Sequence, residues 1–147
     1  EALRDKYVFP GMKILQFAFD SGKGNPYLPV NYHSPNFVVY TGQHDNDTTC
    51  GWYAKRSDDE NQQVWNYIGC NMGQGFHWDL IRLALSTIAN QAIFPLQDIL
   101  GLGTEARMNE PGVPEGNWGW RYHSGSLSPE ASQILAKYTH IYGRAPK

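Results

Sequence analysis

A histidine and two carboxylates follow directly after a short apolar segment, FVVYT at residues 37–41. His44, Asp45, Asn46 and Asp47 are the residues of this cluster. In parallel α/β folds the strands are buried, and the loops after their carboxyl ends carry the chemistry. Carboxylates can stabilise an oxocarbenium-like transition state and move a proton in glycoside chemistry. The cluster is therefore a candidate active-site wall, in which a histidine beside the carboxylates can hydrogen-bond sugar hydroxyls.

Two other interpretations of this cluster stay open. Asp and Asn are common in turns and at helix starts, so a turn without catalytic function fits the same residues. If the strand continues past Thr41, Asp45 and Asp47 point in similar directions, because side chains in a strand alternate with a period of two. A metal site fits less well, since no second cluster of His or Cys lies nearby in the sequence.

A second group of polar and aromatic residues lies at 107–109 and 117–121. Asn109 can both donate to and accept from vicinal hydroxyls, and an arginine such as Arg107 can orient a carboxylate. Trp118 and Trp120 have faces wide enough to stack on a pyranose ring. The preferred interpretation of these two tryptophans is a structured surface loop with the rings buried on the same domain.

A third candidate, Asp98, follows another short apolar segment. It can face the same pocket as Asp45, but we favour a supporting role in which it anchors the loop around Arg107. The glycines at 101 and 103 lack the full spacing of a phosphate-binding turn, so no nucleotide is expected.

The composition narrows the classes of partner. Twelve Lys and Arg against 14 Asp and Glu leave a formal charge of −2, which gives no reason to expect nucleic acid or an anionic membrane. No apolar run of ~18 residues predicts a membrane span. Cys50 and Cys70 are too few for a disulfide framework, so both are predicted to be free thiols in a reducing, cytoplasmic compartment.

The elements that would position these residues alternate along the chain. Strands are predicted at 12–19, 37–41 and 92–96, helices at 1–7, 49–53, 58–67, 79–91 and 129–141, long loops at 20–36 and 104–127, and a glycine-rich turn at 69–76. Ser57 and Ser128 are the expected N-caps, with Pro129 at the first helical position. Alternating strands and helices imply an α/β fold with a parallel sheet and right-handed crossovers. A helix at the very start suggests that the chain begins inside a longer protein.

Five stretches resemble the 4-α-glucanotransferases (amylomaltase or disproportionating enzyme, glycoside hydrolase family 77), which belong with the α-amylase-like retaining enzymes. They are PGMKILQFAF (10–19), NPYLP (25–29), VVYTGQHDNDTTCGWY (38–53), WDLIRLALSTIANQAIFPLQDILGLGTEARMNEPG (78–112) and GNWGWR (116–121). Together they cover nearly the whole chain. Residues 66–77 and 138–146 resemble cyanobacterial members in particular.

The resemblance implies a TIM-type (β/α)8 barrel. Residues 1–147 would form the C-terminal segment of that barrel, about strands 6–8, with no independent second domain. The implied reaction moves a segment of an α-1,4-glucan to a new 4-position on an acceptor glucose or glucan, by a retaining double displacement. The implied partners are maltooligosaccharides and α-1,4-glucans, and no cofactor and no metal are expected.

The family uses three acidic residues, and only the third has a match here, at Asp45. Its implied role is to stabilise the transition state by holding hydroxyls of the donor glucose. His44 resembles a neighbouring sugar contact, and Asp20 and Asn109 resemble further substrate contacts. The nucleophilic Asp and the acid/base Glu have no match, so they are expected upstream of Glu1. The chain alone is then expected to be inactive and unstable.

The sequence departs from the family pattern at two positions, Gln43, where Thr is common, and Cys50, where a larger residue such as Arg is often seen. Two other functions remain as alternatives. One is an amylase-type hydrolase that uses the same third Asp, although ARMN-PG and NWGWR argue against it. The other is a non-catalytic maltooligosaccharide-binding module that uses Trp118 and Trp120 as stacking platforms.

Overall fold

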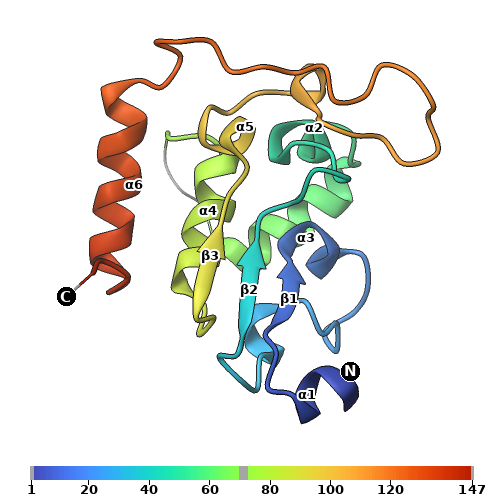
Figure 1. The fold of residues 1–147 in the computed structure, drawn as a ribbon, viewed down its shortest axis with the longest axis vertical. Coiled ribbons are helices and arrows are strands. Elements are labelled where there is room, and N and C mark those ends of the chain that lie inside the picture. The colour runs from blue at the N-terminus through green and yellow to red at the C-terminus, as the bar shows by residue number, and fades with distance from the viewer. Residues whose placement is uncertain (1, 70–72, 147) are drawn as a thin grey trace.

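The computed structural model describes residues 2–69 and 73–146 and contains a small parallel sheet (Figure 1). Its strands are β1 (Gly11–Ile14), β2 (Phe37–Tyr40) and β3 (Gln91–Ile93), in the order β1-β2-β3. Both neighbouring pairs are parallel; Gly11 pairs with Phe37, and Tyr40 pairs with Ile93. The prediction of an α/β fold with a parallel sheet is confirmed.

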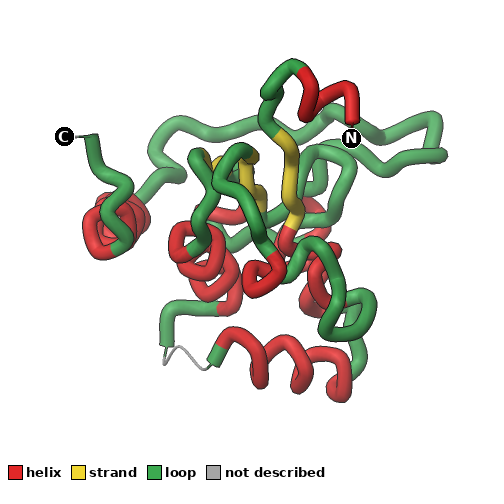
Figure 2. The backbone as a smooth tube through the Cα atoms, turned by 90° about the horizontal axis from the view of Figure 1, so that it is seen from below, coloured by secondary structure: helices red, strands yellow, loops and turns green. Residues whose placement is uncertain are grey.

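The helices that follow β2 in the chain pack mainly on one side of the sheet, as Figure 2 shows from below, whereas α1 lies apart from them beside the N-terminus. The α-helices are α1 (Ala2–Lys6), α2 (Thr49–Ala54), α3 (Asp58–Ile68), α4 (Phe76–Ser86), α5 (Leu96–Ile99) and α6 (Pro129–Ile141). The 3-10 helices are η1 (Leu15–Phe19), η2 (Pro29–Asn31) and η3 (Thr104–Ala106). The long segment between η3 and α6 crosses above the carboxyl ends of the strands (Figure 1).

The main core lies between the sheet and the helices α3 and α4. Val39 of β2, Val64 of α3 and Leu80 of α4 are fully buried in it. A second cluster joins α4 to α6, where Trp78 packs near Tyr138. The opposite face of the sheet is different, because Met12 and Ile93 are exposed there. Burial of one sheet face against helices fixes which strand residues point toward the core.

The helix starts follow the predicted capping signals. Ser57 and Glu60 form a capping box at the start of α3, in which each side chain bonds the other's backbone N–H. The Ser128 side chain accepts from the backbone N–H of Ala131, and Pro129 occupies the first turn of α6. Both N-caps are confirmed.

The strand predicted at 12–19 is wrong in its second half. The chain leaves the sheet after Ile14 and forms η1, in which Leu15 is buried in the core. The buried Gln16 side chain donates to the backbone carbonyl of Asp47 at 2.9 Å, which ties η1 to the loop after β2. A continuous apolar run of this length fits a buried strand and a buried helical turn equally well, so its pattern could not separate them.

Other boundaries also shift from the predicted positions. Strand β3 ends at Ile93, since Pro95 lacks the N–H that a ladder needs and α5 begins directly after it. Helix α4 begins at Phe76 and ends at Ser86 instead of covering 79–91. The Thr87 hydroxyl caps its last turn by donating to the carbonyl of Ala84 at 2.8 Å.

Some predicted features lie partly outside the described residues. Glu1, in the predicted first helix, and Cys70, in the predicted glycine-rich turn, are among them. The described part of that turn contains Gly69 and Gly75, both with positive φ, as the cap residues of α3 and α4. No helix within residues 2–69 and 73–146 is long and apolar enough to cross a membrane.

Candidate functional site

The segments that follow β2 and β3 meet at the carboxyl edge of the sheet. The Asn109 side-chain amide donates to Asp45 Oδ1 at 2.6 Å, and the Asn109 backbone N–H donates to the carbonyl of His44 at 3.0 Å. The His44 Nε2 atom lies 3.3 Å from the same Asp45 oxygen. The structure thus brings together three of the four predicted site residues. The Asp45 side chain remains 54% exposed, so it is open to a ligand.

Arg107 joins the two segments through their backbones. Its Nε donates to the carbonyl of Asn109 and one terminal nitrogen donates to the carbonyl of Asp45, both at 2.9 Å. The side chain is largely covered, and its other terminal nitrogen lies 3.5 Å from a Glu110 oxygen. The sequence suggested that Arg107 orients a carboxylate. The structure shows that, besides this contact with the Glu110 carboxylate, its planar guanidinium bonds the main chains of both segments and holds them together.

Asp47 points away from Asp45. Its side chain is only 8% exposed and contacts Lys55 Nζ at 2.6 Å. The Thr104 hydroxyl donates to the same Asp47 oxygen at 2.9 Å. The strand ends at Tyr40, so the period-two argument that would align Asp45 with Asp47 does not apply. Asp47 therefore links the loop between β2 and α2 (residues 41–48, the site loop) to α2 and η3.

Asp98 fixes the two ends of the site loop. It is 1% exposed and accepts the Thr41 hydroxyl at 2.5 Å. It also accepts the Thr49 backbone N–H at 2.7 Å and the Thr49 hydroxyl at 2.8 Å. Burial raises the pKa of Asp98, and these three hydrogen bonds oppose part of that effect. The carboxylate joins the end of β2 to the start of α2.

The prediction that Asp98 anchors the loop around Arg107 is therefore wrong in its partner. The neighbouring Gln97 does this instead, by donating from its side-chain amide to the carbonyl of Ala106 at 3.2 Å. The sequence gives no sign of this role of Gln97, because a bond from its amide to a distant backbone carbonyl has no counterpart in residue spacing. Its burial at the start of a four-residue helix is visible only in the structure.

Asp20 lies in a different environment from the other three candidates. It follows η1, and its carboxylate oxygen lies 3.4 Å from a terminal nitrogen of Arg56. That guanidinium lies over the Trp52 ring, 4.6 Å from the ring centroid. In the described part of the chain, no recorded contact joins Asp20 to Asp45 or Asn109. The side chain is half exposed, which leaves it open to solvent and ligand.

A pocket of about 460 Å³ lies beside His44, at the end of the sheet. Tyr40 and Phe94 line its apolar wall, and the loop after β2 and Arg107 line its polar side. Ligand pockets of this size combine an apolar lining with a few fixed polar groups. Among the described residues, no group of three or more His, Cys, Asp or Glu could hold a metal ion.

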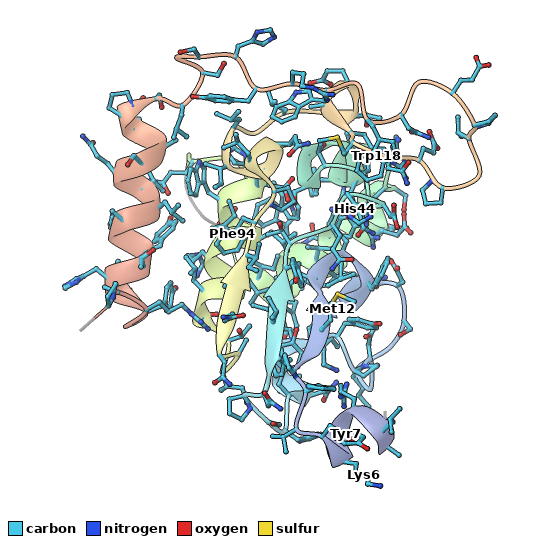
Figure 3. The ribbon with its side chains drawn as sticks, in the orientation of Figure 1. Lys6, Tyr7, Met12, His44, Phe94 and Trp118 are labelled. Atoms are coloured by element: carbon cyan, nitrogen blue, oxygen red, sulfur yellow. The ribbon has the colours of Figure 1, made fainter. Side chains whose placement is uncertain are left out.

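The Trp118 ring packs beside the His44 ring, and Figure 3 labels both residues close together in the upper right part of the molecule. The ring centroids are 5.2 Å apart and the planes are tilted by 40°. Trp118 is 53% exposed, so the expectation that it is buried on its own domain is wrong. Trp120 is half-buried.

Cys50 is a free thiol, as predicted, with its sulfur 3.7 Å from His77 Nδ1. Burial raises the pKa of this thiol, which favours its protonated form. The prediction for Cys70 falls on a residue outside those that the structure describes.

Comparison with known proteins decides the family. The family model described as 4-alpha-glucanotransferase matches residues 1–128. The chain belongs to the 4-alpha-glucanotransferase family. A 4-alpha-glucanotransferase from the cyanobacterium Synechocystis is 61% identical, over 98% of this chain and 28% of that protein. One from Thermus thermophilus is 50% identical, over 88% of this chain and 27% of that protein. The predicted family, with its cyanobacterial likeness, is confirmed.

A solved structure of this family has the same fold. The amylomaltase from Streptococcus agalactiae, in complex with acarbose, superposes with a TM-score of 0.93 at 31% identity. The match covers 99% of this chain and 29% of that one. The chain thus spans between a quarter and three tenths of the length of these 4-alpha-glucanotransferases.

Proposed function

We propose that the chain is the C-terminal part of a 4-α-glucanotransferase. The enzyme transfers a segment of an α-1,4-glucan to a new 4-position on an acceptor glucose or glucan by a retaining double displacement. The observation that carries this proposal is the exposed Asp45 carboxylate, held by Asn109 and by His44, which itself lines a pocket of about 460 Å³. Membership of the family supports the same reaction.

The parallel sheet corresponds to about strands 6–8 of a (β/α)8 barrel. Helices cover one face of the sheet, while apolar residues such as Met12 and Ile93 are exposed on the other. In a closed barrel the inner face of the strands is filled by apolar side chains, so these residues gain partners there. Residues 1–147 then form one segment of the catalytic barrel, without an independent second domain.

Asp45 is the residue that stabilises the transition state. Within the described part of the chain, the recorded contacts of its carboxylate, from Asn109 and His44, both reach Oδ1. Oδ2 is then left for hydroxyls of the donor glucose. A negative charge fixed beside the sugar favours the ring's developing positive character more than its neutral ground state.

His44 and Asn109 contact the sugar beside Asp45, and Asp20 supplies a further substrate contact. The Arg56 guanidinium holds Asp20 in place. The nucleophile and the acid/base come from the rest of the enzyme, so the 147-residue chain alone is inactive. Maltooligosaccharides and α-1,4-glucans are the partners, and the compartment is cytoplasmic.

Transfer, hydrolysis and binding alone differ in their products. A sugar hydroxyl that intercepts the glycosyl-enzyme in place of water gives transfer, which requires that water be excluded. The full-length enzyme should convert maltotriose into both longer and shorter maltooligosaccharides. Glucose and maltose alone would indicate an amylase-type hydrolase. Binding without turnover would indicate a glucan-binding module, the alternative that the exposed Trp118 favours.

A further inference from the structure

We propose that the Trp118 indole is a stacking platform for the glucose unit next to the one that Asp45 holds. This inference rests on the proposed function, because it names a further contact with the same glucan chain. Its ligand class is an α-1,4-linked maltooligosaccharide that extends past the reacting ring. Trp118 would then determine how strongly the enzyme prefers longer chains.

The indole is placed beside the site and is not packed away. Within this segment of the enzyme the side chain is 53% exposed, and its ring contacts the His44 ring at a centroid distance of 5.2 Å. His44 in turn lies 3.3 Å from Asp45. The His44 imidazole thus lies between the indole and the Asp45 carboxylate. A glucose ring stacked on the indole would therefore be the neighbour of the glucose ring that Asp45 holds. Figure 3 shows Trp118 and His44 at this edge.

The backbone of Trp118 adopts a conformation that a bulky residue rarely takes. Its φ is +60°, in the left-handed region that glycine enters without cost. Non-glycine residues held in this region cluster at ligand sites, where the surrounding structure imposes the strain. A glycine at this position would adopt the same backbone conformation without strain. The presence of a tryptophan there indicates that the indole side chain has a role of its own.

Hydrogen bonds on both sides hold this conformation. The Trp118 backbone N–H donates to the carbonyl of Met108 at 2.7 Å, and Arg121 donates to the carbonyl of Trp118 at 2.7 Å. The preceding Asn117 side chain closes the loop, since it accepts the Glu110 backbone N–H at 2.8 Å. The backbone that carries the indole is therefore held in place before any ligand arrives, which lowers the entropic cost of binding.

An aromatic face that is exposed and apolar suits the C–H face of a pyranose ring. Side chains that can bond the hydroxyls at the rim lie next to it, because His44 contacts the indole directly. Aromatic stacking contributes free energies that correspond to about a three- to tenfold change in affinity. The platform adds binding along the chain without changing the charge near the reacting ring.

The test compares variants of the full-length enzyme. They distinguish a Trp118 that stacks on the sugar from a Trp118 that only stabilises the loop. Trp118→Gly removes the indole and relieves the left-handed strain, while glycine increases the freedom of the unfolded chain; the two effects oppose each other, so the melting temperature should stay close to that of the wild type. Its kcat/KM for maltoheptaose should fall about three- to tenfold, with a smaller change for maltotriose. Trp118→Phe should restore most of the loss. Tyr122→Ala, which removes an exposed aromatic ring from the same loop, is the matched control and should leave both values unchanged.

Two results would overturn the proposal. One is a Trp118→Gly enzyme that keeps wild-type kcat/KM for both substrates, and the other is a loss that Trp118→Phe does not restore. Trp118→Asn tolerates the left-handed region and lacks an aromatic face, so it decides the question by the same criteria if Trp118→Gly does not fold. A wild-type enzyme that does not disproportionate maltotriose would instead refute the proposed function.

Discussion

Removal of the buried Asp98 carboxylate should destabilise the protein and loosen the site loop. In Asp98→Ala, the Thr49 backbone N–H and the hydroxyls of Thr41 and Thr49 lose their acceptor. A buried donor without a partner costs about 1–3 kcal/mol. The backbone N–H cannot turn to another acceptor, whereas the two hydroxyls can rotate, so we expect a total loss of about 3 kcal/mol.

The matched variant Asp98→Asn keeps an acceptor for the Thr49 N–H and removes the charge. Because burial raises the pKa of Asp98 in the folded state, the folded protein binds more protons than the unfolded chain between the usual carboxyl pKa and the raised one. Stability from this group therefore falls as pH rises through that window. Asp98→Asn lacks this contribution, so the stability of the wild type relative to the variant should decline across the same window.

The assay is thermal unfolding of the full-length enzyme and the two variants, measured from acidic to neutral pH. We expect Asp98→Ala to melt several degrees below the wild type and Asp98→Asn to melt much closer to it. Equal melting temperatures for Asp98→Ala and the wild type would refute the conclusion that Asp98 holds the two ends of the site loop together. A difference between the wild type and Asp98→Asn that does not vary with pH would refute the raised pKa.

Two further predictions concern the residues around Asp45. Arg107→Met removes the bonds to the carbonyls of Asp45 and Asn109, so kcat should fall about tenfold through misplacement of the carboxylate, with less effect on KM; an unchanged kcat in steady-state kinetics would exclude this positioning role. His44→Ala should weaken both substrate binding and turnover, but less severely than loss of the Asp45 charge; wild-type values of both constants would show that His44 does not contact the sugar.

The sequence predicts the order of elements well, because each signal is local. Alternating strands and helices, the N-caps Ser57 and Ser128, and the polar cluster after β2 all appear where they were expected. Boundaries are less predictable where a tertiary contact ends an element. Strand β1 ends at Ile14. Two residues later the Gln16 side chain donates a hydrogen bond to the carbonyl of Asp47, which lies 31 residues away in the sequence.

The proximity of three of the candidate site residues is likewise expected from the sequence, whereas their roles in the reaction stay a prediction. Asp45, His44 and Asn109 were identified from residue type and family pattern, and the structure joins them across 64 positions of sequence. Arg107 and Gln97 act through bonds to backbone carbonyls, and such bonds leave no trace in residue spacing. Contacts of this kind depend on which loops meet, and that depends on the whole fold.

The most direct test of the account is the turnover of Asp45→Asn in the full-length enzyme, measured as disproportionation of maltotriose. The substitution keeps the shape of the side chain and an oxygen that can accept from Asn109, so the melting temperature should not change. Loss of the negative charge should lower kcat by ~10²–10³-fold. A folded Asp45→Asn enzyme with kcat close to that of the wild type would contradict the central claim that this carboxylate stabilises the transition state.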